Sequence, residues 1–329
     1  MSKKLFLNRA IAAAVSEEME RDENVVLLGE DIINQGGGLS IYLGIAEKFP
    51  GRAIDMPIAE DGYGYFGVGA AVAGDRPIID LMFSDFGTFC ADSIINGAAK
   101  IAFCTQGTVK CPAVFMLANG GRGTYGNIGS GCHHSQCVES WFQNVPGLKI
   151  VAPYYPADVK GLLKASIRDD DPVLFMFHEG SVGMLGEVPD DEDYIIPLTN
   201  AAKIMEEGSD ITIVAIQSMV PLAQKAAEEL KTAGISAELI DPRVLIPLDK
   251  DAIVKSVKKT GKLLVVQEAP KRGSFSGEII TTVLEELRGE MILVDRVCSL
   301  NCPLGNGISE YHVVPKLDDI VNAAKKLCR

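Results

Sequence analysis

The sequence predicts an α/β protein with two doubly wound domains, each a sheet with helices on both faces. Three observations predict this fold. Short β-rich apolar runs alternate with helical patterns along almost the whole chain, which is typical of parallel sheets. The chain has 329 residues, more than one core comfortably holds. A Gly-, Pro- and acid-rich stretch at 179–198 interrupts the alternation once.

The first domain is expected over residues 1–180. Its opening residues, MSKKLFLNRAIAAAVSEEME, are interpreted as an amphipathic helix, because Asn8 and Arg9 interrupt the apolar run and two glutamates follow it, unlike a signal peptide. Continuous apolar runs then predict strands buried on both faces: NVVLLGE, PIIDLMF, PAVFMLA, LKIVAP and PVLFMF. Helices are expected between them at ADSIINGAAKIAFC and PADVKGLLKASIRD.

Residues 181–198 are expected to cross the surface to a second, smaller α/β domain over 199–329. There the alternation restarts with strand DITIVAI, helix MVPLAQKAAEELKTAG, strand ISAELI, helix DKDAIVKSVKKTG and strand KLLVVQEA, and it ends in a terminal helix. Gly234 and Gly261 stand where two of these helices end. Glycine at that position favours a left-handed helix cap.

Composition argues against several classes of protein. The formal net charge is −13 and the basic residues are scattered, so the surface repels phosphate backbones and anionic lipid. We expect no nucleic-acid or membrane partner, and a cytoplasmic location, since no apolar run approaches the ~18 residues of a membrane span. The eight cysteines form no dense disulfide framework, and the spacing of CHHSQC at 132–137 matches no common zinc finger.

The stretch AIDMPIAEDGYGYFG at 53–67 allows two interpretations. Its glycines at 62–67 satisfy G-x-G-x-x-G, which would indicate a dinucleotide-binding turn. Against this, Pro57 breaks the preceding strand, and Asp80 falls inside the next strand rather than at its end, where a ribose hydroxyl would lie. A second match at 121–126 opens onto more glycine instead of a helix.

The alternative interpretation is a catalytic carboxylate at Glu60. This residue sits where a strand gives way to a helix, at the edge where open α/β sheets bind ligands. Glu60 and Asp61 would equally well complement the positive end of the helix dipole. A functional role requires a desolvated Glu60, whose pKa then rises so that it can share a proton with a ligand nitrogen.

His134 is a second candidate for chemistry. It follows the glycine-rich loop NGGRGTYGNIGSG and precedes a helix expected to begin near Ser135. A histidine on such a loop can titrate near neutral pH and reach a substrate. The competing interpretation is a loop histidine that caps the helix.

Eight segments taken in order resemble the β subunit of thiamine-diphosphate-dependent 2-oxo acid dehydrogenases, the decarboxylating component of the pyruvate, branched-chain oxo acid and acetoin dehydrogenase complexes. They are LLGEDI, DMPIAEDGYGYFGVGAAVAG, RPIIDLMFSDF, INGAAKIAF, HHSQ, PGLKIVAPYYPADVKGLL, DPVLF and IDPRVLIPLD. The resemblance runs across nearly the whole chain. It implies a pyrimidine-binding domain of the transketolase-like fold at 1–180, a linker, and a transketolase C-terminal-like domain at 199–329.

The resemblance also implies site residues. The family glutamate that matches Glu60 hydrogen-bonds the aminopyrimidine ring of thiamine diphosphate, and Met82 and Phe86 match positions that pack around that ring. Without the resemblance, these two apolar residues are as well explained as core. His134 matches the histidine of the family HSQ motif, which faces the thiazolium side and helps with the decarboxylated intermediate or with its transfer to lipoamide. Asp169, in SIRDDDP, matches a loop that holds a structural potassium ion in some members, although acids in an exposed turn are the usual alternative.

The resemblance implies partners too. The chain contains no GDG motif, with which such enzymes hold magnesium and the diphosphate, so an α subunit is expected to carry that site in an assembly of two α and two β chains. The expected reaction is oxidative decarboxylation of a 2-oxo acid, or acetoin cleavage, with acyl transfer to a lipoyl group on an acyltransferase core. His133 stands where the family usually has Gln, and the loop Asn119–Gly131 is longer than in pyruvate members. These departures leave the substrate open.

Three other functions stay open. The first is the C-terminal half of a split transketolase, which would share the fold and the glutamate but act on sugar phosphates. The second is an NAD-dependent oxidoreductase, which would bind NAD without a partner chain. The third is a scaffolding subunit without catalytic residues, for which loss of Glu60 would change only assembly.

Overall fold

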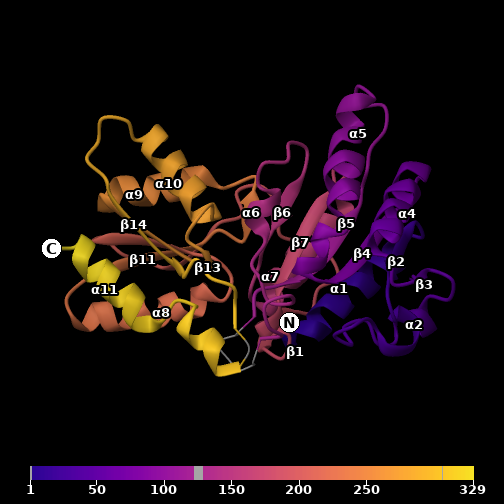
Figure 1. Cartoon of the computed structure of the whole chain (residues 1–329), viewed down its shortest axis with the longest axis horizontal. Helices are drawn as coiled ribbons and strands as arrows, with labels where there is room; N and C mark the ends of the chain where they lie inside the picture. The colour runs from indigo at the N-terminus through magenta and orange to yellow at the C-terminus, as the bar shows by residue number, and fades with distance from the viewer. Residues whose placement is uncertain (1, 122–128, 306) are drawn as a thin grey trace.

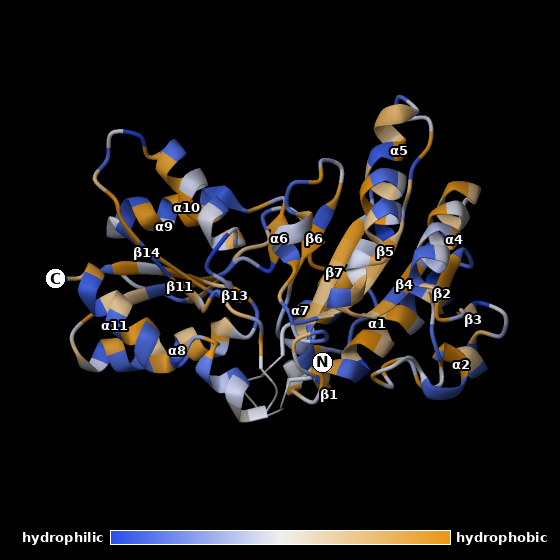
Figure 2. Ribbon diagram, viewed as in Figure 1, coloured by the Kyte–Doolittle hydropathy of each residue, from blue (hydrophilic) through white to orange (hydrophobic). Residues whose placement is uncertain are grey.

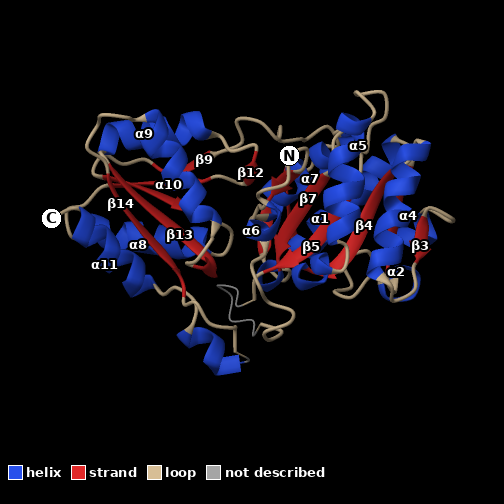
Figure 3. Cartoon of the chain, turned by 45° about the horizontal axis from the view of Figure 1, so that its top comes forward, coloured by secondary structure: helices blue, strands red, loops and turns tan. Residues whose placement is uncertain are grey.

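The computed structural model describes residues 2–121, 129–305 and 307–329. Figure 1 shows two α/β halves side by side, the N-terminal half in indigo to magenta and the C-terminal half in orange to yellow. Each half contains its own sheet, one of seven strands and one of five. In Figure 3 the strands of each sheet lie next to one another with helices on both faces. The predicted fold class is therefore confirmed.

The seven-stranded sheet is almost entirely parallel. In spatial order its strands are β12 (Val244–Ile246), β6 (Lys149–Val151), β7 (Val173–His178), β5 (Val114–Asn119), β4 (Arg76–Phe83), β2 (Val25–Gly29) and β3 (Ala53–Asp55). Every neighbouring pair is parallel except β12 with β6. Every residue of β5 and β7 is buried, which explains why these strands read as continuous apolar runs.

Helices cover both faces of this sheet. On one face, α1 (Leu7–Arg21) and α7 (Pro156–Arg168) pack into a shared apolar core, which α2 (Ile32–Gln35) and α3 (Ile45–Lys48) extend. On the other face lie α4 (Glu60–Ala73) and a helical segment made of η2 (Ser93–Ala98) and α5 (Ala99–Cys104). Figure 2 shows the apolar central strands enclosed between these helices. No helix among the described residues is long and apolar enough to cross a bilayer.

The five-stranded sheet follows the same plan. Its strands in order are β14 (Leu293–Ser299), β13 (Lys262–Pro270), β10 (Ile211–Ala215), β11 (Ala237–Asp241) and β9 (Lys203–Glu206). Helices α8 (Met219–Thr232) and α11 (Leu317–Leu327) cover one face, and α9 (Lys250–Thr260) and α10 (Phe275–Glu286) cover the other. Gly234 and Gly261 have φ angles of 79° and 67°, so both predicted left-handed caps are confirmed. Strand β9, antiparallel to β11, was not predicted.

The first residues of the chain differ from the prediction. The expected helix over residues 1–20 is wrong at residues 2–6, because β1 (Ser2–Phe6) is a strand and α1 begins at Leu7. Strand β1 pairs antiparallel with β8 (Leu185–Pro189), which lies inside the stretch interpreted as a surface crossing. The physical reason is a partner that is distant in the sequence, a pairing that no local pattern reveals.

Strand β12 joins the two halves. After β11 the chain leaves its own sheet, and Val244 pairs with Val151 at the edge of the other sheet. Arg243 anchors this crossing, because its guanidinium lies 2.7 Å from Asp158 Oδ1 and donates to the carbonyl oxygen of Ala201 at 2.6 Å. One apolar core also runs from α4 through to α10. The two halves are thus packed as one structure.

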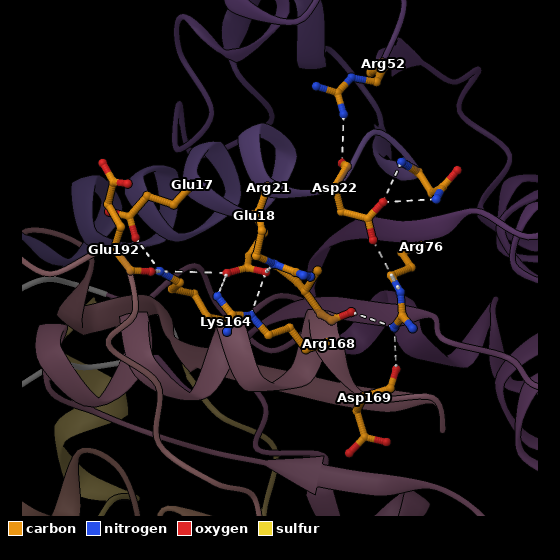
Figure 4. A network of polar contacts seen from close by, with 12 residues as sticks. Glu17, Glu18, Arg21, Asp22, Arg52, Arg76, Lys164, Arg168, Asp169 and Glu192 are labelled. Carbon is orange, nitrogen blue, oxygen red and sulfur yellow. Dashed lines mark hydrogen bonds and ion pairs between the residues drawn. The ribbon is translucent and has the colours of Figure 1, made fainter.

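A network of ion pairs fastens α1 to α7 (Figure 4). Glu17 lies 2.7 Å from Lys160 Nζ and 2.6 Å from Lys164 Nζ, and both lysine side chains are fully buried. Arg168 donates two hydrogen bonds to the buried carboxylate of Glu18, at 2.9 and 2.7 Å. Burial acts to raise the pKa of Glu18, but hydrogen bonds from Arg168 and Arg21 outweigh it and hold the pKa below its ordinary value.

Candidate active site

The candidate site residues gather at one edge of the seven-stranded sheet. Glu30 directly follows the end of β2, and Glu60 follows the end of β3 after a short connection. Strand β4 ends at Phe83 and passes into η1 (Ser84–Thr88), which carries Phe86. Because these strands are parallel, their carboxyl ends meet at one edge, the usual ligand-binding edge of such sheets.

Glu60 begins helix α4, as the sequence predicted a strand-to-helix junction. It is partly buried, and its backbone oxygen accepts a hydrogen bond from Cys90 Sγ at 2.8 Å. Asp61 is exposed, and its own Oδ1 accepts from the backbone N–H of Gly62 at 2.8 Å. Asp61 therefore serves the helix start, whereas Glu60 is the carboxylate held closer to the interior.

A second carboxylate, Glu30, lies beside Glu60, and the sequence analysis missed it. Burial raises the pKa of Glu30, the negative charges of Glu60 and Asp31 raise it further, and a hydrogen bond with Tyr63 opposes them. Its Oε1 is buried without a hydrogen-bond partner among the described residues. A buried acceptor with no donor next to a second carboxylate fits a ligand that brings N–H groups, as an aminopyrimidine ring does.

Three rings form an aromatic cluster near this edge. His134 meets Phe83 edge-on, with centroids 4.7 Å apart, and meets Phe86 at 5.2 Å. Phe83 and Phe86 are themselves 5.9 Å apart at nearly right angles. The structure thus brings the predicted residues His134 and Phe86 together. Edge-on contacts of this kind suit a site for a flat heterocycle.

The segment around His134 differs from the expected helix start. The residues after Ser135 are not helical, and α6 (Glu139–Phe142) begins four positions later. His134 N–H donates instead to the carbonyl oxygen of Gly131 at 3.1 Å, so the helix-capping interpretation is wrong. Ser135 Oγ accepts from the N–H of Ser130 at 2.6 Å. Such side-chain bonds offer the backbone an alternative to helix.

The side chain of Met82 packs against the segment that follows α2. An added Cβ at Gly38 would lie 2.5 Å from the Met82 sulfur, and Tyr42 and Phe177 lie nearby. Met82 has the unusual φ of 61°. The backbone N–H of Met82 donates to Asp80, whose pKa burial raises to about 7. The role of Met82 beside a cofactor stays a prediction.

Asp169 lies at the opposite edge of the sheet. It follows α7 and precedes the start of β7, whereas Glu60 follows the carboxyl end of a strand. Both of its carboxylate oxygens lie 2.7 Å from Lys149 Nζ. Among the described residues, no group of three or more His, Cys, Asp or Glu side chains is arranged to hold a metal ion.

The glycine motif at 62–67 lies inside helix α4 rather than in a turn before it. Gly64 allows close approach of Ser93, to which an added Cβ would lie within 2.5 Å, and Gly67 does the same for Ile79 at 2.3 Å. These glycines serve packing between the helix and its neighbours, which does not match the dinucleotide-binding turn. Of the second match at 121–126, only Gly121 is among the described residues.

A buried polar network joins the two halves behind the His134 segment. Asn119 Nδ2 donates to Gln217 Oε1 at 2.8 Å and to Glu139 Oε2 at 3.2 Å, and Gln267 donates to the other oxygen of Glu139. Asn119 Oδ1 accepts from the N–H of Val138 at 3.1 Å. This network fixes the start of α6 against the C-terminal half. Its members were not predicted, because the sequence does not tell which strand ends meet.

Two family descriptions match the chain, one in each half. Residues 3–184 match the transketolase pyrimidine binding domain, and residues 200–320 match the transketolase C-terminal domain. Together they define a chain of the transketolase class. A solved structure titled "Split gene transketolase, inactive beta4 tetramer" superposes with a TM-score of 0.79 over 98% of both chains at 22% identity, which supports the fold alone.

Curated relatives narrow the class. The chain is 39% identical to the mitochondrial pyruvate dehydrogenase E1 component subunit beta-1 of Arabidopsis thaliana, covering 99% of this chain and 90% of the relative. It is 44% identical to the 2-oxoisovalerate dehydrogenase subunit beta of Bacillus subtilis, covering 84% and 83%. It is 37% identical to the acetoin:2,6-dichlorophenolindophenol oxidoreductase subunit beta of Cupriavidus necator, covering 99% and 98%. The chain belongs to the family of E1 β subunits of thiamine-diphosphate-dependent 2-oxo acid dehydrogenases, and the predicted resemblance is confirmed.

Proposed function

We propose that this chain provides the pyrimidine half of a thiamine diphosphate site in an enzyme that decarboxylates a 2-oxo acid, or cleaves acetoin, and transfers the acyl group to a lipoyl group. One observation carries the proposal. Glu60 and Glu30 lie together at the carboxyl edge of the sheet, and Glu30 Oε1 is buried without a partner among the described residues. The pair offers acceptors for the ring N–H groups of an aminopyrimidine.

The roles of this chain's residues follow from that geometry. When bound, the cofactor supplies the carbanion chemistry that protein side chains lack. Glu60 would hydrogen-bond the pyrimidine ring nitrogen, and its negative charge, after burial, helps to raise the pKa of the neighbouring Glu30. His134, held by Phe83 and Phe86, would present its imidazole to the reacting carbonyl of the substrate or product. An imidazole in this position can donate a hydrogen bond to a carbonyl oxygen or accept one from a hydroxyl group.

A partner chain is supported by the surface of α4 and α5. Large apolar side chains are exposed on these helices, among them Phe103 at 89% and Phe66 at 52%, and Ile58, at 85%, is exposed in the connection just before α4. Gly69 of α4 has no atom near its Cβ position, so another backbone can approach closely. Apolar surface of this kind usually marks an interface. We assign it to an α-type chain that carries magnesium and the diphosphate, in an assembly of two α and two β chains.

The proposed substrate is one of the three compounds that appear in the names of the relatives, which are pyruvate, 2-oxoisovalerate and acetoin. The identities to these relatives span only 37 to 44%, so similarity does not choose among them. The acyl acceptor is proposed to be the lipoyl group of an acyltransferase core. A panel of the three substrates with free lipoamide as acceptor, tested on the reconstituted enzyme, identifies the preferred one by kcat/KM.

The decisive test compares neighbouring carboxylates. Glu60→Gln, in the complex with the α-type chain, is expected to lower kcat by ~10²–10⁴-fold and to weaken thiamine diphosphate binding by calorimetry with magnesium. Asp61→Asn is the matched control, since Asp61 is exposed and its carboxylate accepts a hydrogen bond from the Gly62 N–H at the start of α4. Equal losses in both variants would mean that the two acids only complement the helix dipole, and the catalytic assignment would fall. Tight binding of NAD by the chain alone would support the oxidoreductase alternative.

A further inference from the structure

The acidic turn after α7 binds the ammonium group of Lys149, a residue of β6. Lys149 Nζ lies 2.7 Å from both carboxylate oxygens of Asp169 and 3.1 Å from Oδ2 of Asp171. The N–H of Asp171 also donates to Asp169 Oδ1 at 2.9 Å. Burial acts to lower the pKa of Lys149, but the bonds to Asp169 and Asp171 outweigh it, so the pKa is raised and the ammonium stays charged at neutral pH.

The guanidinium of Arg76 is a second cation at this turn, and it binds the backbone carbonyl oxygens. Arg76 donates from Nη1 to the carbonyl oxygens of Ile167 and Asp169, at 3.1 and 3.0 Å, and from Nη2 to Asp170 Oδ1 at 2.7 Å. Its Nε lies 3.7 Å from Asp22 Oδ2. Figure 4 shows the guanidinium between Asp22 and the turn. The oxygens that end α7 are thus directed at a protein side chain.

This arrangement does not fit a free metal ion at the same oxygens. A hard cation needs several oxygen ligands arranged around one centre. Here both carboxylate oxygens of Asp169 accept hydrogen bonds from the ammonium of Lys149. The carbonyl oxygens of Ile167 and Asp169 accept hydrogen bonds from Arg76. We infer that Lys149 and Arg76 are the resident cations of this turn and take the place of the potassium ion that the resemblance implied for Asp169. The inference concerns stability and does not depend on the proposed function.

The turn is a structural junction, which gives the inference a measurable consequence. The N–H of Lys149 donates to the carbonyl oxygen of Pro172 at 3.1 Å, and Lys149 pairs with Val173 where β6 and β7 begin. The ammonium therefore bridges two carboxylates at the point where α7, β6 and β7 meet. A chain with a built-in cation gains nothing from dissolved potassium at this turn. A chain without it leaves two acids side by side that a dissolved cation can bind.

Thermal unfolding of the full chain in KCl and in choline chloride of equal ionic strength tests the inference. The wild type is expected to unfold at the same temperature in both salts. Lys149→Met is expected to unfold at lower temperature in choline chloride and to regain stability with KCl along a saturating curve. Lys149→Arg keeps the positive charge and is expected to stay indifferent to potassium. Lys258→Met is the control for a lost surface charge, because Lys258 and its partner Glu290 are exposed and 3.8 Å apart.

Two outcomes would overturn the inference. A saturating, potassium-specific rise in the unfolding temperature of the wild type would mean that a free cation joins the turn despite Lys149. An equal loss of stability for Lys149→Met in both salts would mean that the ammonium is an ordinary ion pair and stands in for no cation. If Lys149→Met fails to fold, the wild-type and Lys149→Arg measurements still decide the matter.

Discussion

His134 stands edge-on to Phe83, with ring centroids 4.7 Å apart and ring planes at 85°. The contact sets the imidazole at the carboxyl edge of the sheet, although His134 itself lies on a turn outside any helix or strand. An aromatic contact of this type is worth ~0.5–1.5 kcal/mol beyond burial. The contact with Phe83 restricts the position of a histidine ring that the backbone alone does not fix.

We therefore expect Phe83→Leu to lower kcat of the reconstituted enzyme by about tenfold, because the imidazole loses one of its two ring contacts while the core stays apolar. KM for the oxo acid should change little. Steady-state kinetics with lipoamide as acceptor checks this, with circular dichroism as the control for folding. Unchanged kcat in both Phe83→Leu and Phe86→Leu would show that neither ring positions His134.

Glu30 gives a prediction about pH. Its pKa in the folded chain is raised, so the stability associated with its protonated form is complete at low pH and is lost as the pH rises through the folded pKa. Glu30→Gln stays neutral and keeps that stability. The cofactor-free variant is therefore expected to unfold at a higher temperature than wild type at pH 7–8, and the difference should vanish near pH 4. A difference independent of pH would contradict the raised pKa.

Two glycines of α4 predict opposite effects of the same substitution. Gly67→Ala would place its Cβ 2.3 Å from Ile79 Cδ1, and overpacking of this kind costs ~1–3 kcal/mol. Gly69→Ala meets no atom within 4 Å and should gain up to ~1 kcal/mol from helix propensity. Denaturant unfolding of the chain alone measures both. Because Gly69 lies on the apolar face assigned to the partner, the same substitution should weaken assembly with the α-type chain.

The contact between Arg168 and the buried Glu18 predicts a measurable loss on truncation. Arg168→Met removes two hydrogen bonds to the Glu18 carboxylate, which keeps Arg21 and Lys164 as neighbours, at a cost of ~1–3 kcal/mol at neutral pH. The folded pKa of Glu18 is lowered, so its stabilising effect is present above its ordinary value and is lost as the pH falls through the folded pKa. The deficit of the variant should therefore shrink in acid.

Lys250→Met is the comparison for that experiment, because its pair with Glu286 is exposed on both sides, at 51% and 44%. Exposed pairs of this kind contribute little to stability, because water screens the two charges. Unfolding temperatures from pH 7 down to pH 3 separate the two variants. If both lost the same small amount at neutral pH, the α1–α7 network would be no more than surface charge.

Much of the fold could be predicted because its signals are local. The apolar runs of β2, β4, β5 and β7 follow from burial on both faces, and Gly261 marks the end of α9 by a conformation that glycine favours. Strand β12 could not be predicted, since Val244–Ile246 is too short to show periodicity and its partner Val151 is distant in the chain. Pairing between distant segments has no signature within either one.

The candidate site also contains some residues that local sequence predicts and others that depend on contacts between distant segments. Glu60 was predicted as a site residue from its place after a strand, and His134 from its place on a glycine-rich loop and a motif shared with the family. Glu30 was missed because its importance arises from the pairing of β2 with β3, which puts two carboxylates together. The sequence likewise placed Asp169 in an acidic turn but gave no sign that Lys149 reaches its carboxylate.

Strand β12 also limits how this chain can be cut or recombined. A gene fragment that stops before residue 244 would leave the outer side of β6 with unpaired backbone groups, and an open strand edge invites pairing with other molecules. Such a fragment would be prone to aggregate even if its own core were intact. In hybrids made by exchanging C-terminal halves between relatives, the incoming β12 would have to pair correctly with β6 of the other half. The two halves therefore depend on each other for folding, although each has its own sheet.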